Sequence, residues 1–422
     1  MQEIMIFKSK NLKSFDGDRD FEIRPITIVT GENSSGKTAF IQLFSAAYRT
    51  ISKRKYGGFD PYFSSYEDIA TYKGGRYGRD AIFGFGLEQG KGAKRLCTYI
   101  ECKNEAGASS IKTFQASLGA DSIEINAEAG KFILRIDGGD NEFDIKKILS
   151  QSPSKNTIKM DPLRILYNIN YKSESIDVRR AETIIRMQRF RLAKNQITEF
   201  APIRAKPQKY YDGLPVDEDS TGSQTPYLLK RFYNESLRDD DLKKKFHQLK
   251  EFGIKSGLFE WIGTRKLGKS STDPFQILVS QSGPQSNMPE VGYGVNQALP
   301  IVAHLFFSAQ SNEKIVIQQP EVHLHPRAQA ELGSLFVKIR NDINASFIIE
   351  THSDYLIDRI RVAIREGKLL HSDFQILHFT KKRGSTNVSA IHVNENGQYI
   401  DVPDGYRDFF LREQMVLLGV DN

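Results

Sequence analysis

The stretch GENSSGKT, residues 31 to 38, constrains the fold of this 422-residue chain more than any other feature. It matches the pattern G-x-x-x-x-G-K-[ST] and lies between a β-branched run, ITIVT, and an amphipathic segment over residues 39–54. In such a strand–loop–helix unit, the backbone amides of the loop point at phosphate oxygens. Lys37 is predicted to reach the β and γ phosphates of a nucleotide, and the Thr38 hydroxyl to bind Mg²⁺. The nucleotide-binding residues predicted here are Asn33, Ser34, Ser35, Gly36, Lys37 and Thr38.

The hydrophobic pattern on either side of this loop predicts an α/β fold. Residues 81–145 alternate apolar and polar in short runs separated by Gly, Asn and Asp, which favours an antiparallel sheet. After residue 280, short apolar strands alternate with helical segments, which is typical of a mostly parallel sheet. We therefore expect an N-terminal lobe at 1–147, a mainly helical insertion at 148–262 and a C-terminal lobe at 263–422.

The composition is ordinary for a water-soluble globular protein, with 39% hydrophobic and 26% charged residues. No stretch reaches the ~18 consecutive apolar residues of a membrane span, and the N-terminus lacks the apolar core of a signal peptide. We therefore expect a cytoplasmic protein that does not associate with a membrane.

The formal net charge of +7 is unevenly distributed along the chain. Residues 177–194 read DVRRAETIIRMQRFRLAK, in which apolar residues recur at helical spacing among basic ones. A basic helix of this kind can contact a nucleic-acid backbone or an acidic protein. It can equally be the solvated face of a projecting helix, so DNA contact stays open.

Three further motifs follow the loop in a fixed order toward the end of the chain. They are VGYGVNQALPIV at 291–302, KIVIQQPEVHLHP at 314–326 and FIIETHSDYL at 347–356. In this order they resemble the signature, Walker B, D-loop and H-switch of the ABC/SMC class of ATPases. QPEVHLHP and ETHSDYL, with APIRAKPQKYY at 201–211, are similar to the OLD-type branch of that class. Within the branch, the resemblance is to ATPase subunits of two-component anti-phage systems of the PARIS or Septu kind.

The resemblance implies an ABC-type ATPase domain, with a mixed sheet and an antiparallel β subdomain, interrupted by the helical insertion. It also implies that two protomers hold ATP and Mg²⁺ between the phosphate loop of one chain and the glycine-rich signature of the other. Gly292, Gly294 and Asn296 are the signature residues expected to face the nucleotide, and Gly292 stands where a serine is common. His352 is expected to contact the γ phosphate or the attacking water, although a lone histidine after a strand can also be structural.

The Walker B-like strand departs from its class, because Gln318 and Gln319 occupy the positions of the usual acidic pair. Gln318 is predicted to orient a Mg²⁺-bound water, and Gln319 the attacking water. A neutral amide cannot accept a proton, and general-base assistance is worth ~10² to 10⁴ in rate, so slow hydrolysis is expected. Glu321 is the remaining carboxylate on this stretch. It is predicted either to take over part of the base role or to be a structural acid bonded to His323 or His325.

Nucleases of the OLD type carry a Toprim domain after the ATPase, and that domain needs a D-x-D pair to hold Mg²⁺. The 70 residues that follow His352 contain no D-x-D. We therefore expect an oligomeric sensor and scaffold ATPase that restrains a separate nuclease effector, Toprim-like or HNH-like, until a phage-derived trigger arrives. The alternative is an SMC/Rad50-like DNA-repair ATPase, which is disfavoured because residues 148–260 contain no sustained heptad repeat.

Overall fold

The chain divides into two compact units. The first consists of Met1–Arg24, Glu32–Ile197 and Thr380–Asn387, and the second of Pro25–Gly31, Thr198–Phe379 and Val388–Asn422. The computed structural model describes residues 5–52, 61–63, 65–74, 78–90, 94–126, 131–136, 139–144, 184, 196–212, 217, 219–270, 272–382, 385–403, 405–407, 413 and 415–419.

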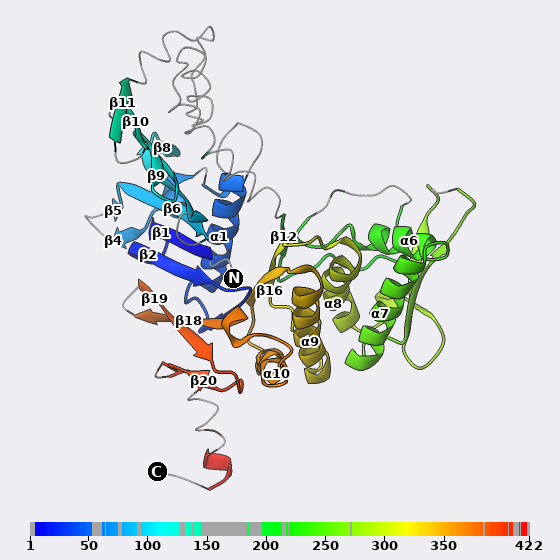
Figure 1. The fold of residues 1–422 in the computed structure, drawn as a ribbon. Helices are drawn as coiled ribbons and strands as arrows, with labels where there is room; N and C mark the ends of the chain where they lie inside the picture. The colour runs from blue at the N-terminus through cyan, green and yellow to red at the C-terminus, as the bar shows by residue number, and fades with distance from the viewer. Residues whose placement is uncertain are drawn as a thin grey trace. The chain divides into compact units, whose positions relative to one another are not determined.

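An eight-stranded antiparallel sheet forms the main part of the first unit (Figure 1). Its strands are, in spatial order, β11 (Gly139–Asp144), β10 (Lys131–Ile136), β9 (Asp121–Asn126), β8 (Ala108–Leu118), β7 (Leu96–Glu105), β6 (Ile82–Gln89), β1 (Met5–Leu12) and β2 (Phe15–Ile23). The alternation of apolar and polar residues over 81–145 therefore predicted the antiparallel sheet correctly, since each of the strands β6 to β11 pairs antiparallel with its neighbours.

Helix α1 (Lys37–Ser52) begins inside the predicted phosphate loop and packs on this sheet through aromatic side chains. The rings of Phe21 and Phe40 lie 5.1 Å apart and those of Phe7 and Phe44 5.7 Å apart, in edge-to-face arrangements. These contacts fix the start of α1 against β1 and β2. The short elements of this unit are η1 (Pro61–Phe63), α2 (Tyr66–Ile69), β4 (Tyr72–Gly74) and β5 (Gly78–Arg79).

A seven-stranded sheet provides the frame of the second unit. Its order is β12 (Ile197–Phe200), β16 (Lys314–Gln318), β17 (Ser346–Glu350), β3 (Ile26–Gly31), β18 (Phe374–Lys382), β19 (Ser385–Val393) and β20 (Tyr399–Ile400). Strands β16, β17, β3 and β18 are parallel, as the alternation of strands and helices predicted. Their carboxyl ends therefore meet at one edge, where ligands of open α/β sheets commonly bind.

Helices cover this parallel sheet, with α10 packed on α9, α7 on α9 and α6 on α8 (Figure 1). Asp239 caps α7 and Ser353 caps α10, each through a side-chain oxygen that accepts backbone N–H groups. None of the described helices is both long and apolar enough to cross a lipid bilayer. The remaining elements of this unit are α6 (Thr225–Glu235), α7 (Asp240–Ser256), β13 (Trp261–Lys266), β14 (Phe275–Ser280), β15 (Ser286–Asn287), η4 (Met288–Glu290), α8 (Tyr293–Ala303), η5 (His304–Ser308), α9 (Pro326–Ile343), α10 (Asp354–Arg365) and η6 (His371–Asp373).

Much of the predicted insertion lies outside the described residues, including 148–183 and 185–195. The basic segment 177–194 falls in this part of the chain, apart from Ile184. The described part of 148–262 contains α6 and α7 together with β12 and the start of β13. The boundaries at 147 and 262 remain predictions.

Candidate nucleotide site

The phosphate loop, in the first unit, has a backbone suited to binding an anion. Ser34 and Gly36 have positive φ angles of 61° and 104°. Such angles within a loop turn successive N–H groups toward a common point. Lys37 is only 5% exposed, and its Nζ donates to the Glu32 carbonyl oxygen at 2.6 Å, so the ammonium lies close to the start of the loop.

The other loop residues differ in their exposure. Asn33 and Ser34 are exposed, and Thr38 is exposed in the first turn of α1. Ser35 is buried, and no described residue hydrogen-bonds to its Oγ. A buried hydroxyl without a partner is unusual in a folded protein, and a phosphate oxygen is one group that can satisfy it. The loop therefore fits a bound triphosphate.

A residue that the sequence did not indicate supports this loop from the far end of the chain. The Thr386 hydroxyl donates to the Ser35 carbonyl oxygen at 2.8 Å and lies 2.7 Å from Ser14 Oγ. Thr386 N also donates to the Ser14 carbonyl oxygen at 3.0 Å. Thr386 follows Ser35 by 351 positions, so no local pattern could have found it.

The first glycine of the motif belongs to the second unit, at the end of β3. Gly31 has a φ of 139°, and a β-carbon at this position would overlap the carbonyl oxygen of Phe379 in β18. Only glycine permits this close approach of two parallel strands. The tight packing places the end of β3 directly beside β18, where the loop begins.

The Walker B-like strand ends at the same edge of the sheet as β3. Gln318 is the last residue of β16 and is 8% exposed. Gln319 has a φ of 48°, and its N–H donates to the Glu350 carbonyl oxygen at 2.8 Å. Non-glycine residues with positive φ are uncommon, and a following proline disfavours most compact conformations of the residue before it. The chain therefore turns sharply at the position predicted to orient the attacking water.

Glu321 connects this turn to the predicted switch residue. Its Oε1 accepts the backbone N–H of His352 at 2.7 Å, whereas its Oε2 is buried without a partner among the described residues. The expected structural partners of Glu321, His323 and His325, do not make this hydrogen bond to its Oε1. The His323 ring packs on Tyr293, and His325 Nδ1 accepts the Arg327 N–H. The His352 side chain is exposed.

Glu350, which the motifs did not mark as a candidate, adds a carboxylate to this edge. It is the last residue of β17, 3% exposed, and it is in register with Gln318 of β16 and Val29 of β3. Residues in register on neighbouring strands direct their side chains to the same face of a sheet. Its position at the carboxyl end of a strand beside the phosphate-loop strand was the available signal.

The signature residues differ in what their surroundings require. Gly292 caps α8, and a β-carbon there would meet nothing within 4 Å. A β-carbon at Gly294 would lie 2.8 Å from the His323 carbonyl oxygen, so packing within the chain already accounts for this glycine. Asn296 is buried, and its Nδ2 donates to the Ala205 carbonyl oxygen at 3.1 Å. Packing among the described residues therefore explains why position 294 is a glycine but does not explain why position 292 is one.

Each unit, taken by itself, contains residues suited to Mg²⁺. The Thr38 hydroxyl is exposed in the first, and Gln318 and Glu350 end neighbouring strands in the second. Oxygen donors of this kind are those that Mg²⁺ prefers. In the second unit the carboxylate is supplied by β17, where the class uses β16.

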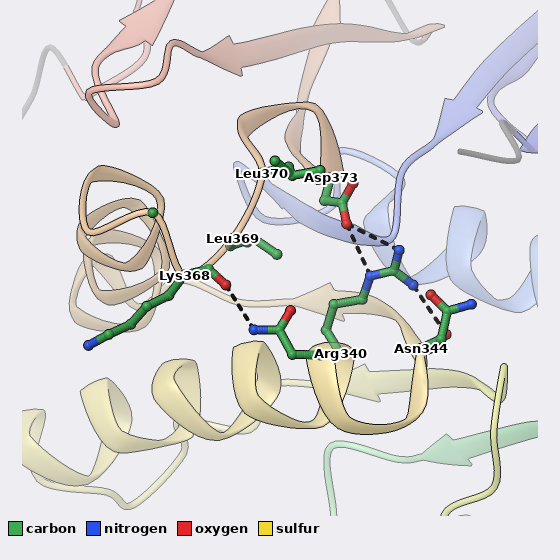
Figure 2. Close-up of a pocket in the computed structure, with 8 residues that line it drawn as sticks. Arg340, Asn344, Lys368, Leu369, Leu370 and Asp373 are labelled. Carbon is green, nitrogen blue, oxygen red and sulfur yellow. Dashed lines mark hydrogen bonds and ion pairs between the residues drawn. The ribbon is translucent and has the colours of Figure 1, made fainter. Parts of the chain in front are cut away.

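A separate hollow of about 250 Å³ lies at the opposite edge of the parallel sheet (Figure 2). Its lining includes Arg340 and Asp373, whose side chains are joined by a hydrogen bond of 3.1 Å. Asp373 immediately precedes β18 and Asn344 lies just before β17, so the hollow is at the amino ends of the strands. It is therefore not part of the predicted nucleotide site.

Comparison with known proteins places the chain in a family. Residues 144–357, just over half of the chain, match the family described as "AAA ATPase domain". The chain belongs to the AAA ATPase domain family. This AAA ATPase has a mixed α/β fold with several sheets, and the predicted α/β class is confirmed.

Solved structures similar to this AAA ATPase are head domains of SMC proteins. An Smc head domain from Pyrococcus furiosus, bound to the C-terminal domain of ScpA, is 11% identical, covers 99% of each chain and has a TM-score of 0.46. The SMC head domain from Thermotoga maritima is 12% identical, covers 93% of this chain and 100% of its own, and has a TM-score of 0.41. No curated protein matches the AAA ATPase in sequence.

Proposed function

We propose that this ATPase binds ATP tightly, hydrolyses it slowly, and acts as an oligomeric sensor and scaffold that controls a separate nuclease effector in anti-phage defence. The observation that carries the proposal is the end of β16, where Gln318 and Gln319 replace the usual acids. An amide can orient a water molecule but cannot accept its proton, which removes ~10² to 10⁴ in rate. Slow turnover suits an ATP-bound state that must persist until another event releases it.

Different residues supply binding and hydrolysis in this proposal. The loop amides of Asn33 to Gly36 and the Lys37 ammonium hold the phosphates, and Thr38 holds Mg²⁺. These groups need only their local conformation, which the positive φ angles of the loop support. Tight binding is therefore compatible with a weakened hydrolysis site.

The hydrolysis site lies at the carboxyl ends of β16 and β17. With Mg²⁺ bound, Gln318 would orient a water on the metal, and Gln319 would orient the attacking water. Glu321 accepts the proton that this water loses as its oxygen bonds to the γ phosphorus and the bond to ADP breaks. His352 contacts the γ phosphate. The hydrogen bond from its backbone N–H to Glu321 couples the positions of these two residues.

Assembly through the signature is the second element of the proposal. The backbone at Gly292 is open, and the neighbouring Tyr293 is 50% exposed. An open glycine turn at a helix N-terminus can bring its amides close to phosphates carried by a second chain. ATP bound by one chain would then hold two chains together.

The test measures assembly and turnover on the same full-length protein. Sedimentation velocity is recorded with ATP, with ADP and without nucleotide, and phosphate release is followed under the same conditions. We expect an oligomer that forms with ATP and disassembles with ADP. We expect the neighbouring gene to encode a nuclease, and this protein, co-expressed with the ATPase, should be captured with one nucleotide state and not with the other. Rapid turnover without any ATP-dependent assembly would contradict the proposal.

The SMC/Rad50-like alternative is favoured by the basic segment of the sequence. Its cations are Arg179, Arg180, Arg186, Arg189, Arg191 and Lys194. Binding of duplex DNA that weakens steeply with salt, and that is lost when these residues are replaced by glutamate, would support direct action on DNA.

A further inference from the structure

Arg204 is a buried cation beside the end of the glutamine strand. Arg204 lies four residues after the end of β12, in the second unit, and is 3% exposed. Nη1 donates to the carbonyl oxygen of Gln318 at 3.2 Å. Its Nε and Nη2 are buried without a hydrogen-bond partner among the described residues. A guanidinium with two unpaired N–H groups inside a protein requires an explanation, since nearly all such groups are paired.

Glu321 is the charged residue that acts on Arg204. Burial lowers the pKa of the Arg204 guanidinium to about 10, and the attraction of the Glu321 carboxylate opposes this shift. The Arg204 guanidinium is thus hydrogen-bonded to the last residue of β16 and attracted by the carboxylate three residues further along. Removing one of two opposite charges is costly when the charge left behind is buried, as that of Arg204 is.

The segment that carries Arg204 is itself held in place. Ala205 N donates to the Thr221 carbonyl oxygen at 3.0 Å, and the Ala205 carbonyl oxygen accepts from Asn296 Nδ2 at 3.1 Å. Before it, Ala201 N donates to the Ser220 carbonyl oxygen at 2.8 Å. A side chain on a segment fixed at both ends has little freedom to move away from its partners.

We propose that Arg204 is a positioning residue for ATP hydrolysis that acts through Glu321, fixing the turn after β16 and holding the Glu321 carboxylate beside it. The inference rests on the proposed function, in which Glu321 receives the proton of the attacking water. Two features separate it from a purely structural role. A neutral donor would satisfy the Gln318 carbonyl oxygen equally well, so a charge is not needed for that bond. In the sequence, Gln319 with its positive φ lies between Gln318, which Arg204 contacts, and Glu321, which attracts Arg204.

A double-mutant cycle tests the inference on the full-length chain. The variants are Arg204→Gln, Glu321→Gln and the pair, each assayed for turnover and for the Kd of ATP. We expect Glu321→Gln to lower kcat about 100-fold and Arg204→Gln about 10-fold, each with the Kd changed less than about 2-fold. The double variant should be no slower than Glu321→Gln alone, to within about 2-fold, because both changes remove one effect. Arg204→Lys, which keeps the charge without the planar fork, should recover part of the lost rate.

Arg340→Gln is the matched control. Arg340 is a half-buried arginine of the second unit, with Nη2 3.1 Å from Asp373 Oδ2, but it lies at the opposite edge of the sheet (Figure 2). Its replacement should leave kcat unchanged even where it lowers the melting temperature. If Arg204→Gln does not fold, Arg204→Lys replaces it in the cycle. The variants are then Arg204→Lys, Glu321→Gln and the double variant that carries both changes.

Two results would overturn the inference while the proposed function stands. One is a double variant whose losses multiply, and the other is a rise of about 10-fold or more in the Kd of ATP for Arg204→Gln, which would mean that Arg204 contacts the nucleotide. A wild-type chain that binds no ATP, or that does not hydrolyse it, would instead contradict the proposed function and the inference together.

Discussion

The phosphate loop and the carboxyl ends of β16 and β17 are two halves of the predicted chemistry, and they relate differently to the sequence. In the loop, each residue type of the motif is present, and Lys37 is buried against the carbonyl of Glu32. At the strand ends, the expected acids are amides, and the carboxylates come from Glu321 beyond the turn and Glu350 on the next strand. The phosphate loop keeps the residue types of the motif. At the strand ends, the carboxylates come from positions other than those of the usual acidic pair.

The difference indicates that binding and hydrolysis can vary independently in one fold. Binding needs backbone amides and one ammonium group, and a short local sequence fixes both. Hydrolysis needs a proton acceptor at a set position, which any strand reaching the same edge can supply. A chain can therefore keep its affinity for ATP while its turnover rate changes.

The largest expected effect comes from removing the ammonium group of the loop. Lys37→Ala loses charge-assisted hydrogen bonds to the phosphates, and we expect the Kd of ATP to rise about 100-fold or more. Isothermal titration calorimetry measures it. Lys230→Ala is the control, because Lys230 is a buried lysine of α6 whose Nζ lies 4.6 Å from the centre of the Phe275 ring. Equal affinities for the two variants would show that the loop is not the binding half.

The two signature glycines give a matched pair with a smaller effect. In Gly294→Ala the new β-carbon lies 2.8 Å from the His323 carbonyl oxygen, and we expect the free energy of unfolding to fall by about 1 to 2 kcal/mol. In Gly292→Ala the β-carbon meets nothing within 4 Å, so stability should change by less than about 0.5 kcal/mol. Urea denaturation measures both. ATP-dependent assembly should weaken for Gly292→Ala, and an unchanged assembly would remove Gly292 from the predicted interface.

The smallest effect is expected from the residue that supports the loop. Thr386→Val removes a hydroxyl that donates to the Ser35 carbonyl oxygen, at a cost of about 1 kcal/mol and about a 3-fold loss of ATP affinity. Thr264→Val in β13 is its control, because the Thr264 hydroxyl is buried without a partner among the described residues. Its removal should be neutral or slightly stabilising. A larger loss for Thr264→Val than for Thr386→Val would contradict the role of Thr386.

The helices and strands could be predicted from the local pattern of apolar and polar residues. Contacts between residues far apart in the sequence could not. The loop, α1, the antiparallel sheet and the parallel strands each follow from the spacing of neighbouring residues. The residues that support the site do not. Arg204 lies 114 positions before Gln318, so only the pairing of β12 with β16 in one sheet brings its segment to this edge.

The role of Glu321 shows the same limit in a single residue. Its neighbours along the chain, His323 and His325, were the partners that the sequence offered. The folded chain gives it the N–H of His352, 31 positions away, because β17 lies beside β16. The pairing of β16 with β17 decides the contact, and no pattern local to Glu321 shows this pairing.

The most direct measurement is the turnover of wild type and of Gln319→Glu at saturating ATP, with Gln319→Ala and Glu321→Ala beside them. We expect slow hydrolysis by wild type, below about 1 s⁻¹, and a rise of about 10²-fold when a carboxylate is restored at position 319. Glu321→Ala should lower the wild-type rate further. Rapid turnover by wild type that is lost in Gln319→Ala but kept in Glu321→Ala would contradict this view of the strand.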